Sequence, residues 1–238
     1  MVGHTASWRQ FRENWTTIDH LVDLRQGPRS VSRLERAALN QAAMVFMVTM
    51  WEAYAEDVSK ELADHIALYA RTFKELPKRL RSVVSAGVTS KPPKWLPADI
   101  ADQGWEDILR LNARKLAGKV NTPSTVNVDS LIHDTTGYES VSTAWQWQGM
   151  RPSRAAELLE EAIQTRHEIV HTGRKPDRLN ANWIKTYGNN IQQVVNKTDS
   201  VLFEYGNSFG TMIDFTRANI SQAQQWLVEE VGDADEYP

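Results

Sequence analysis

Apolar residues recur every three or four positions along most of this chain, which is the spacing of one face of an α-helix. The pattern predicts a short basic helix that starts at Pro77, a second short helix near residues 128–133, and longer helices over about residues 8–24, 32–73, 102–120, 154–171, 179–205 and 220–230. No segment alternates apolar and polar residues as a strand does. We therefore predict an all-α bundle in one domain, residues 1–228, followed by an acidic tail, residues 229–238.

Local signals place several of the predicted helix ends. Gly27–Pro28 ends the first helix, and either Ser30 or Ser32 is positioned to cap the long helix that follows. Ser153 is positioned in the same way to cap a later helix, which Gly173 ends. These residue types supply what helix ends need, namely a side-chain acceptor at the start and a left-handed backbone at the finish.

An irregular insert, residues 121–150, precedes that later helix. It contains one proline and two glycines that break any long helix, and only its centre has helical spacing. Trp145 and Trp147 alternate with polar residues near its end. We predict that these two rings anchor the insert to the core.

Composition narrows the class of protein. With 41% hydrophobic and 24% charged residues, the 238-residue chain has the balance of an ordinary soluble globular protein. Its best apolar run, Ala42 to Trp51, is about half the length that a bilayer requires, so we expect no membrane association. The first ten residues lack the order of a signal peptide, which leads us to expect a cytoplasmic protein. The absence of cysteine excludes disulfides, thiolate metal sites and cysteine nucleophiles.

Charge is distributed unevenly. The net charge of −3 comes from the last ten residues, which carry five carboxylates and neither Lys nor Arg. Between residues 71 and 94, seven Lys and Arg residues stand against one Glu. Such a stretch is typical either of a surface that follows nucleic-acid phosphates or of a solvated helix face. Within it, Lys78, Arg79 and Arg81 are the candidates for binding RNA.

Ten residues, 164–173, carry the candidate chemistry, and they read QTRHEIVHTG. On a helical wheel Arg166 falls at the centre of the apolar stripe, where an unpaired charge costs several kcal/mol, on the order of 3 or more. Glu52 interrupts the apolar stretch of the long helix, so we predict a buried pair between Glu52 and Arg166. His167 and His171 lie one turn apart on a neighbouring face, at the carbonyl end of the helix, which favours a protonated imidazole.

The spacing of Arg166, four intervening residues and His171 resembles the R-x4-6-H signature of the HEPN superfamily, with His167 as the polar residue that usually follows the arginine. The upstream stretch RAALNQAAMVFMVTMWEAYAEDV resembles the long first helix of RiboL-PSP-type HEPN proteins. The stretches TPSTVNVDSLIHDTTGYESVSTAWQWQG and NWIKTYGNNIQQVVNKTDSVLFEY resemble the insert and closing helix of that group. The resemblance spans about residues 30–205.

The resemblance implies a HEPN-type helical bundle that forms a homodimer, with two motif helices facing each other across a cleft. It implies a metal-independent endoribonuclease of toxin, antiphage or RNA-processing type, without a cofactor. An antitoxin or other regulatory protein is its candidate partner. His171 is then the general acid and base, Arg166 stabilises charge on the phosphate, and His167 assists. Arg174 and Lys175, directly after the motif, either hold RNA phosphates or face water.

Other interpretations of the same residues stay open. Residues 167–171 also spell H-E-x-x-H, the pattern of a zinc peptidase, for which Glu204 is a conceivable third ligand. A HEPN fold without catalysis, acting as a dimeric binding module, is a second alternative. In a third, Arg166 and Glu52 pair for structural reasons alone, and His171 only caps its helix.

Overall fold

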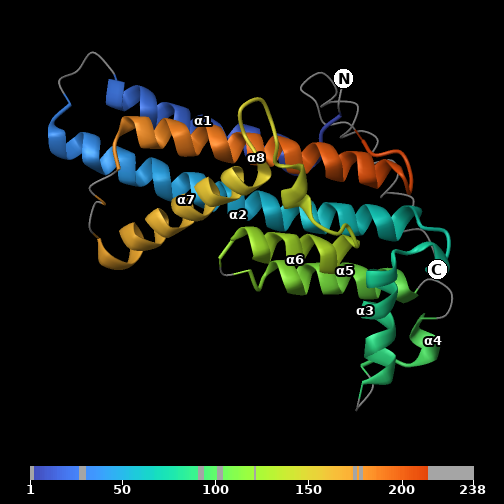
Figure 1. Cartoon of the computed structure of the whole chain (residues 1–238). Coiled ribbons are helices and arrows are strands. Elements are labelled where there is room, and N and C mark those ends of the chain that lie inside the picture. The colour runs from blue at the N-terminus through green and yellow to red at the C-terminus, as the bar shows by residue number, and fades with distance from the viewer. Residues whose placement is uncertain are drawn as a thin grey trace, which may run out of the picture.

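The computed structural model describes residues 3–26, 31–90, 94–100, 104–120, 122–173, 176 and 179–213, without the side chains of residues 26 and 99. These residues form helices and connecting loops, and their only β-type pairing is an isolated bridge between Trp147 and Met150 (Figure 1). The chain is therefore all-α, as predicted. In order, the elements are α1 (Ala6–Gln26), α2 (Arg33–Tyr69), the 3-10 turn η1 (Phe73–Glu75), α3 (Lys78–Thr89), α4 (Pro97–Ile100), α5 (Gly104–Ala117), α6 (Thr125–Thr136), η2 (Val141–Ala144), α7 (Pro152–Thr172) and α8 (Ala181–Asn207).

Side-chain and backbone caps set the ends of the long helices. Ser32 is the N-cap of α2, and it forms a capping box in which Ser32 and Glu35 each accept the other's backbone N–H. Asn180 caps α8 by accepting from the backbone of residues 182 and 183. Gly173 ends α7 in the left-handed conformation, with φ of 65°, as the sequence predicted.

The predicted start of α7 was wrong by two residues, because the helix begins at Pro152. The N-cap is Arg151, and Ser153 lies inside the first turn instead of capping it. Pro152 explains the difference, because proline at the first helical position has φ already set and no N–H that needs an acceptor. The α2 helix likewise ends at Tyr69, before the predicted Phe73, which lies in η1.

The long helix α2 occupies the centre of the bundle. It contacts α1, α5, α6, α7 and α8, and one hydrophobic cluster extends from α1 through α2 to α8. Every turn of α2 from Ala43 to Ala67 contributes buried side chains to that cluster. A single hydrophobic core thus spans the described helices, and the division into one domain and a tail stays a prediction. The boundary at residue 228, the predicted helix 220–230 and the acidic tail lie outside the described residues.

The insert before α7 is fixed by a buried tryptophan. Trp145 is fully buried; its indole Nε1 donates to the Thr198 hydroxyl at 2.9 Å, and its ring lies edge-on to Trp51. Trp147 is only partly buried but also packs on the core. The prediction that these rings anchor the insert is confirmed.

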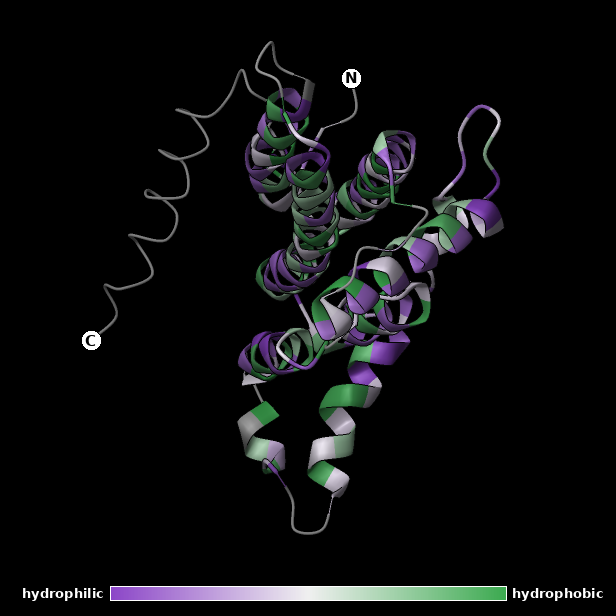
Figure 2. Ribbon diagram, turned by 90° about the vertical axis from the view of Figure 1, so that its left-hand side faces the viewer, coloured by the Kyte–Doolittle hydropathy of each residue, from purple (hydrophilic) through white to green (hydrophobic). Residues whose placement is uncertain are grey.

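The helices α3 and α4 extend together from one side of the bundle (Figure 1 and Figure 2). The Trp95 indole donates to the Val84 carbonyl at 2.8 Å and lies so close to Gly87 that no side chain fits there. Within the described part of the chain, no helix has the combined length and apolar character of a membrane span.

Candidate functional site

The C-terminal part of α7 extends beyond the core of the protomer. Its buried side chains end at Thr165, and from there the helix carries half-buried Arg166 and exposed His167, Val170 and His171. Val170, an apolar residue, is 52% exposed. In Figure 1 this end of α7 points away from the other helices, at the left. The segment that carries the candidate chemistry is thus open to a ligand or to a second chain.

Arg166 is the half-buried member of the group. Its Nε is buried and has no hydrogen-bond partner among the described residues. Glu52, on α2, is close enough to interact electrostatically with this guanidinium, but no ion pair within 4.0 Å joins the two in the described structure. Burial raises the pKa of Glu52, and the positive charge of Arg166 partly opposes that increase. The predicted direct pair is therefore a looser electrostatic contact, which leaves donors of Arg166 available.

His167 and His171 lie side by side on the exposed face. Their ring centroids are 4.2 Å apart with 43° between the planes, as residues one helical turn apart allow. Both stand in the last turns of α7, near the carbonyl end of the helix. Two imidazoles and one incompletely paired guanidinium supply proton transfer and positive charge within three turns of helix.

These groups do not converge within one protomer. Residues five apart on a helix differ by about 140° in direction, so His171 and Arg166 point to different sides of α7. Arg166 lies toward α2, whereas the imidazoles face outward. A substrate that contacts both groups must lie across the helix end or between two such ends.

The basic candidates lie elsewhere in the protomer. Lys78, Arg79 and Arg81 are exposed on α3, which contacts α5 and α6 and stands at the opposite side of Figure 1 from the end of α7. Arg79 is engaged with Asp134, to which its Nε and Nη2 approach at 2.8 and 2.7 Å. The structure therefore does not join these residues to the motif within one chain. Arg174 and Lys175 lie outside the described residues.

The donor set does not complete a zinc site of the peptidase type. Within the described ranges, no group of three or more His, Cys, Asp or Glu residues is arranged to hold a metal ion. Glu204, the conceivable third ligand, interacts with Tyr138 near the far end of α8. It lies roughly 35 Å along that helix from its start, the end that follows the motif. Glu204 is therefore not a partner of His167 and His171 in the same chain.

Sequence reasoning missed a buried polar cluster at the start of α1. Asp199 is fully buried in α8 and accepts hydrogen bonds from His4 at 2.8 Å, from Tyr54 at 3.4 Å and from Thr5. Burial raises the pKa of the Asp199 carboxyl, and the bonds from His4 and Thr5 oppose that increase. The available signal was a carboxylate on the apolar face of the closing helix. Its partners lie between 145 and 195 residues away along the chain and so leave no local pattern in the sequence.

A model of the RiboL-PSP-HEPN family matches residues 9–204 of the chain. No curated protein matches the chain. No solved structure matches it either. The family match covers every described helix from the first turns of α1 to the last turns of α8, including Arg166 and His171.

Proposed function

The chain belongs to the RiboL-PSP-HEPN family, and on that premise we propose that it is a metal-independent endoribonuclease whose catalytic cleft forms between two copies of the chain. Arg166 and His171 carry the chemistry in this proposal, and His167 assists. The observation that carries it is the exposed end of α7, where two adjacent imidazoles and an incompletely paired guanidinium extend beyond the protomer's own core.

The proposed reaction is an intramolecular phosphoryl transfer within RNA. A ribose 2′-hydroxyl attacks the adjacent phosphorus as its proton leaves to an imidazole, and the bond from phosphorus to the 5′-oxygen breaks as that oxygen receives a proton. The products are a 2′,3′-cyclic phosphate and a free 5′-hydroxyl. An imidazole with a pKa near neutrality is suited to both proton transfers. A guanidinium offers paired donors to the extra negative charge on the phosphorane, so the protein supplies both functions.

A second copy of the chain explains features that one copy leaves incomplete. His171 cannot act as base and acid on opposite sides of a phosphate at once, and Arg166 points to another side of α7. Two motif helices facing each other bring two histidine pairs and two arginines to one cleft. The exposed Val170 and the half-buried Ile169 supply apolar surface beside the motif, as a dimer interface requires.

The partner and setting of the activity follow from the same proposal. The substrate is single-stranded or looped RNA, and Lys78, Arg79 and Arg81 are proposed to bind its backbone outside the cleft. Arg174 and Lys175 are proposed to hold phosphates next to the motif. By family analogy the enzyme acts in the cytoplasm as a toxin or antiphage nuclease, controlled by an antitoxin or regulatory protein.

RNA cleavage in excess EDTA tests this function directly. We expect the wild-type chain to cleave RNA under chelation and to leave cyclic phosphate ends, whereas H171A and R166A lose at least 100-fold in rate, roughly the contribution of acid–base catalysis. The matched controls are H20A on α1 and R36A on α2, which remove one exposed residue of each type from helices other than the motif helix. Equal activity of the motif and control variants would refute the assignment. If chelation abolishes cleavage, the nuclease depends on a metal. If the folded wild type binds RNA without cleaving it, the family's fold serves here as a binding module.

A further inference from the structure

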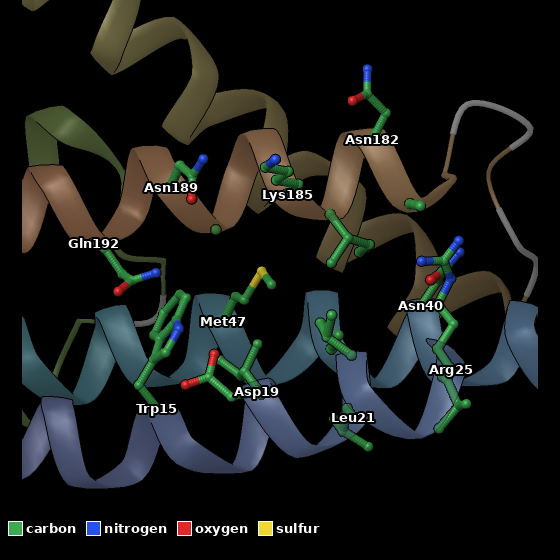
Figure 3. A pocket seen from close by; sticks show the side chains of 17 residues that line it. Trp15, Asp19, Leu21, Arg25, Asn40, Met47, Asn182, Lys185, Asn189 and Gln192 are labelled. Atoms are coloured by element: carbon green, nitrogen blue, oxygen red, sulfur yellow. The ribbon is translucent and has the colours of Figure 1, made fainter. Parts of the chain in front are cut away.

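A hollow between α1, α2 and α8 is separate from the candidate nuclease site. Its volume is about 470 Å³, within the range of small-molecule sites, and Figure 3 shows it between the three helices. None of its lining residues belongs to the motif of α7. It lies at the end of the bundle where α8 begins.

Two polar atoms in its lining are buried and lack partners. The Asn40 side chain on α2 is 5% exposed, and its Oδ1 has no hydrogen bond in the described structure. The Nε of Arg25, on α1, is likewise buried and without an acceptor in that part of the chain. Buried amide and guanidinium groups without partners are costly, and native structures keep few of them. Because both groups line the same hollow, a bound molecule accounts for both.

The charges at one end of the hollow favour an anion. Arg25 and Asn40 lie at the same end of the view in Figure 3 as Asn182, in the first turn of α8, where the helix dipole adds positive potential. Lys185 follows one turn later on the same helix. Asp19 is the only acidic residue of the described lining. None of these three charged side chains forms an ion pair within the described ranges, so their charges are free to act on a ligand.

The other end of the hollow suits an apolar body. The side chains of Trp15 and Met47 form its floor there, with Ile18 beside them, and all three are buried. The amides of Asn189 and Gln192 border this end from α8. Gln192 is held in place because its Oε1 accepts from Arg12 at 2.6 Å. Asp19 also lies at this end, beside Trp15 in Figure 3. The lining therefore changes along its length from a cationic end to an end where apolar side chains lie beside amides and one carboxylate.

We propose that this hollow binds a small organic anion, with a phosphate or carboxylate head at Arg25 and Asn40 and an apolar ring or chain over Trp15 and Met47. The head accepts from the guanidinium. Because an ionised head cannot donate to an amide oxygen, the Asn40 amide must turn its Nδ2 toward the head and donate to it, in place of the Oδ1 that has no partner in the described structure. The proposal requires neither RNA cleavage nor a dimer, so its failure and that of the nuclease proposal are distinguishable.

Four probes separate the elements of this recognition. Phenyl phosphate and 3-phenylpropionate present the two anionic heads on a ring, 3-phenylpropanol presents the ring without charge, and inorganic phosphate presents the charge alone. Binding is measured by calorimetry and by the NMR shift of the Trp15 indole, assigned with W15F. We expect Kd values of about 1 mM or tighter for one or both ring anions, as fragments of this size allow, and at least tenfold weaker binding of the other two probes.

Matched variants locate the site. R25Q is expected to weaken binding of the ring anion at least tenfold, whereas R9Q, which removes the same charge from the same helix outside the hollow, leaves it unchanged. N40L is expected to raise the melting temperature of the unliganded protein, because it removes a buried unpaired amide, and to abolish ligand-induced stabilisation. No binding of any probe to the folded wild type, equal binding of the alcohol, or equal loss in R25Q and R9Q would each overturn the proposal.

Discussion

The imidazole Nδ1 of His4 lies 2.8 Å from Oδ2 of Asp199, so the first described residues of the chain are held against α8, the last described helix. Two carboxylates share this task. Asp199 accepts from residues 4, 5 and 54, while Glu61 of α2 accepts from the backbone N–H groups of residues 6 and 7 and so caps α1 from outside. The N-terminal helix is thus fixed to α2 and α8 by buried polar contacts as well as by its apolar face.

Removal of the Asp199 carboxylate should destabilise the fold strongly. D199A leaves the Thr5 hydroxyl and the Tyr54 hydroxyl without this acceptor in a dry environment, and we expect a loss of about 2–4 kcal/mol in the free energy of unfolding. Urea titration followed by circular dichroism measures it. D57A removes an exposed carboxylate on α2 and should cost less than about 0.5 kcal/mol. Similar losses in the two variants would show that the buried cluster contributes little.

The Glu61 carboxyl should give stability a specific pH dependence. Burial raises the pKa of Glu61 above its usual 4.5, although hydrogen bonds from residues 6 and 7 oppose the increase. The folded state then binds this proton more tightly than the unfolded state, so the contribution of Glu61 to stability falls as the pH rises from 4.5 through the raised pKa. In E61Q nothing titrates at this position.

We therefore expect the free energy of unfolding of the wild type, relative to E61Q, to fall as the pH rises through this window and to stay constant above it. Urea titrations of both proteins at successive pH values measure the difference, in which all other titrating groups cancel. A difference that grows with pH would show that the hydrogen bonds to the ionised carboxylate outweigh its burial.

A shared cleft predicts complementation between inactive chains. When H171A and R166A chains are mixed and allowed to exchange, about half of the dimers carry one intact His171 and one intact Arg166 on different chains. We expect RNA cleavage in the mixture to recover well above that of either parent. Native mass spectrometry establishes that mixed dimers form. A mixture that contains them and stays inactive would show either that both residues act within a single chain or that the cleft needs His171 or Arg166 from both copies.

Alanine variants of two glycines can distinguish the effect of backbone strain from an effect on the geometry of the motif. Gly173 and Gly149 both have positive φ, at 65° and 77°, and an added Cβ meets no atom within 4 Å at either position. Alanine at each should therefore cost about 1–2 kcal/mol through backbone strain alone. Only G173A changes the end of the motif helix, so we expect it to reduce RNA cleavage while G149A does not. Equal cleavage by the two variants at matched stability would show that the end of α7 has no part in positioning His171.

The basic residues of α3 should differ in their contribution to RNA binding. Arg79 already pairs with Asp134, whereas Lys78 and Arg81 are exposed and have no ion pair in the described structure. Each lost phosphate contact reduces the salt slope of binding to a single strand by about 0.7. We expect that reduction in K78Q and R81Q and a smaller one in R79Q, measured by fluorescence anisotropy at several salt concentrations. If the exposed control R36Q matches them, the effect is one of net charge alone.

Much of the fold follows from local sequence. Some helix ends are marked by signals that act within a few residues, so they are predictable. The start of α2 is marked by Ser32 with Glu35, and the end of α7 by Gly173. Pro152 and Ser153 compete for one helix start, and the prediction preferred the side-chain cap to the proline that already has the required φ. Short α4 has too few residues to show any periodicity.

The candidate site was predictable in its spacing but not in its surroundings. One-turn spacing places His167 beside His171 in any helix, and the structure agrees. The wheel also placed Arg166 at the centre of an apolar stripe, but it cannot tell where the neighbouring helices stop covering that stripe. They stop at Thr165, so the arginine is only half-buried. Features that join distant parts of the chain, such as the hollow that Asn40 lines between α1, α2 and α8, depend on tertiary packing and leave no pattern along the sequence.

The central place of α2 has a consequence for synthesis. Of the helices that cover it, only α1 precedes it along the chain, while α5 to α8 are translated afterwards. Part of the apolar face of this 37-residue helix therefore stays uncovered on the ribosome until about residue 207 has emerged. The capping box at Ser32 stabilises the helix in the meantime, but it does not hide that face. The nascent chain should accordingly depend on chaperones that bind exposed apolar helices, and ribosome stalling before α8 should yield aggregation-prone fragments.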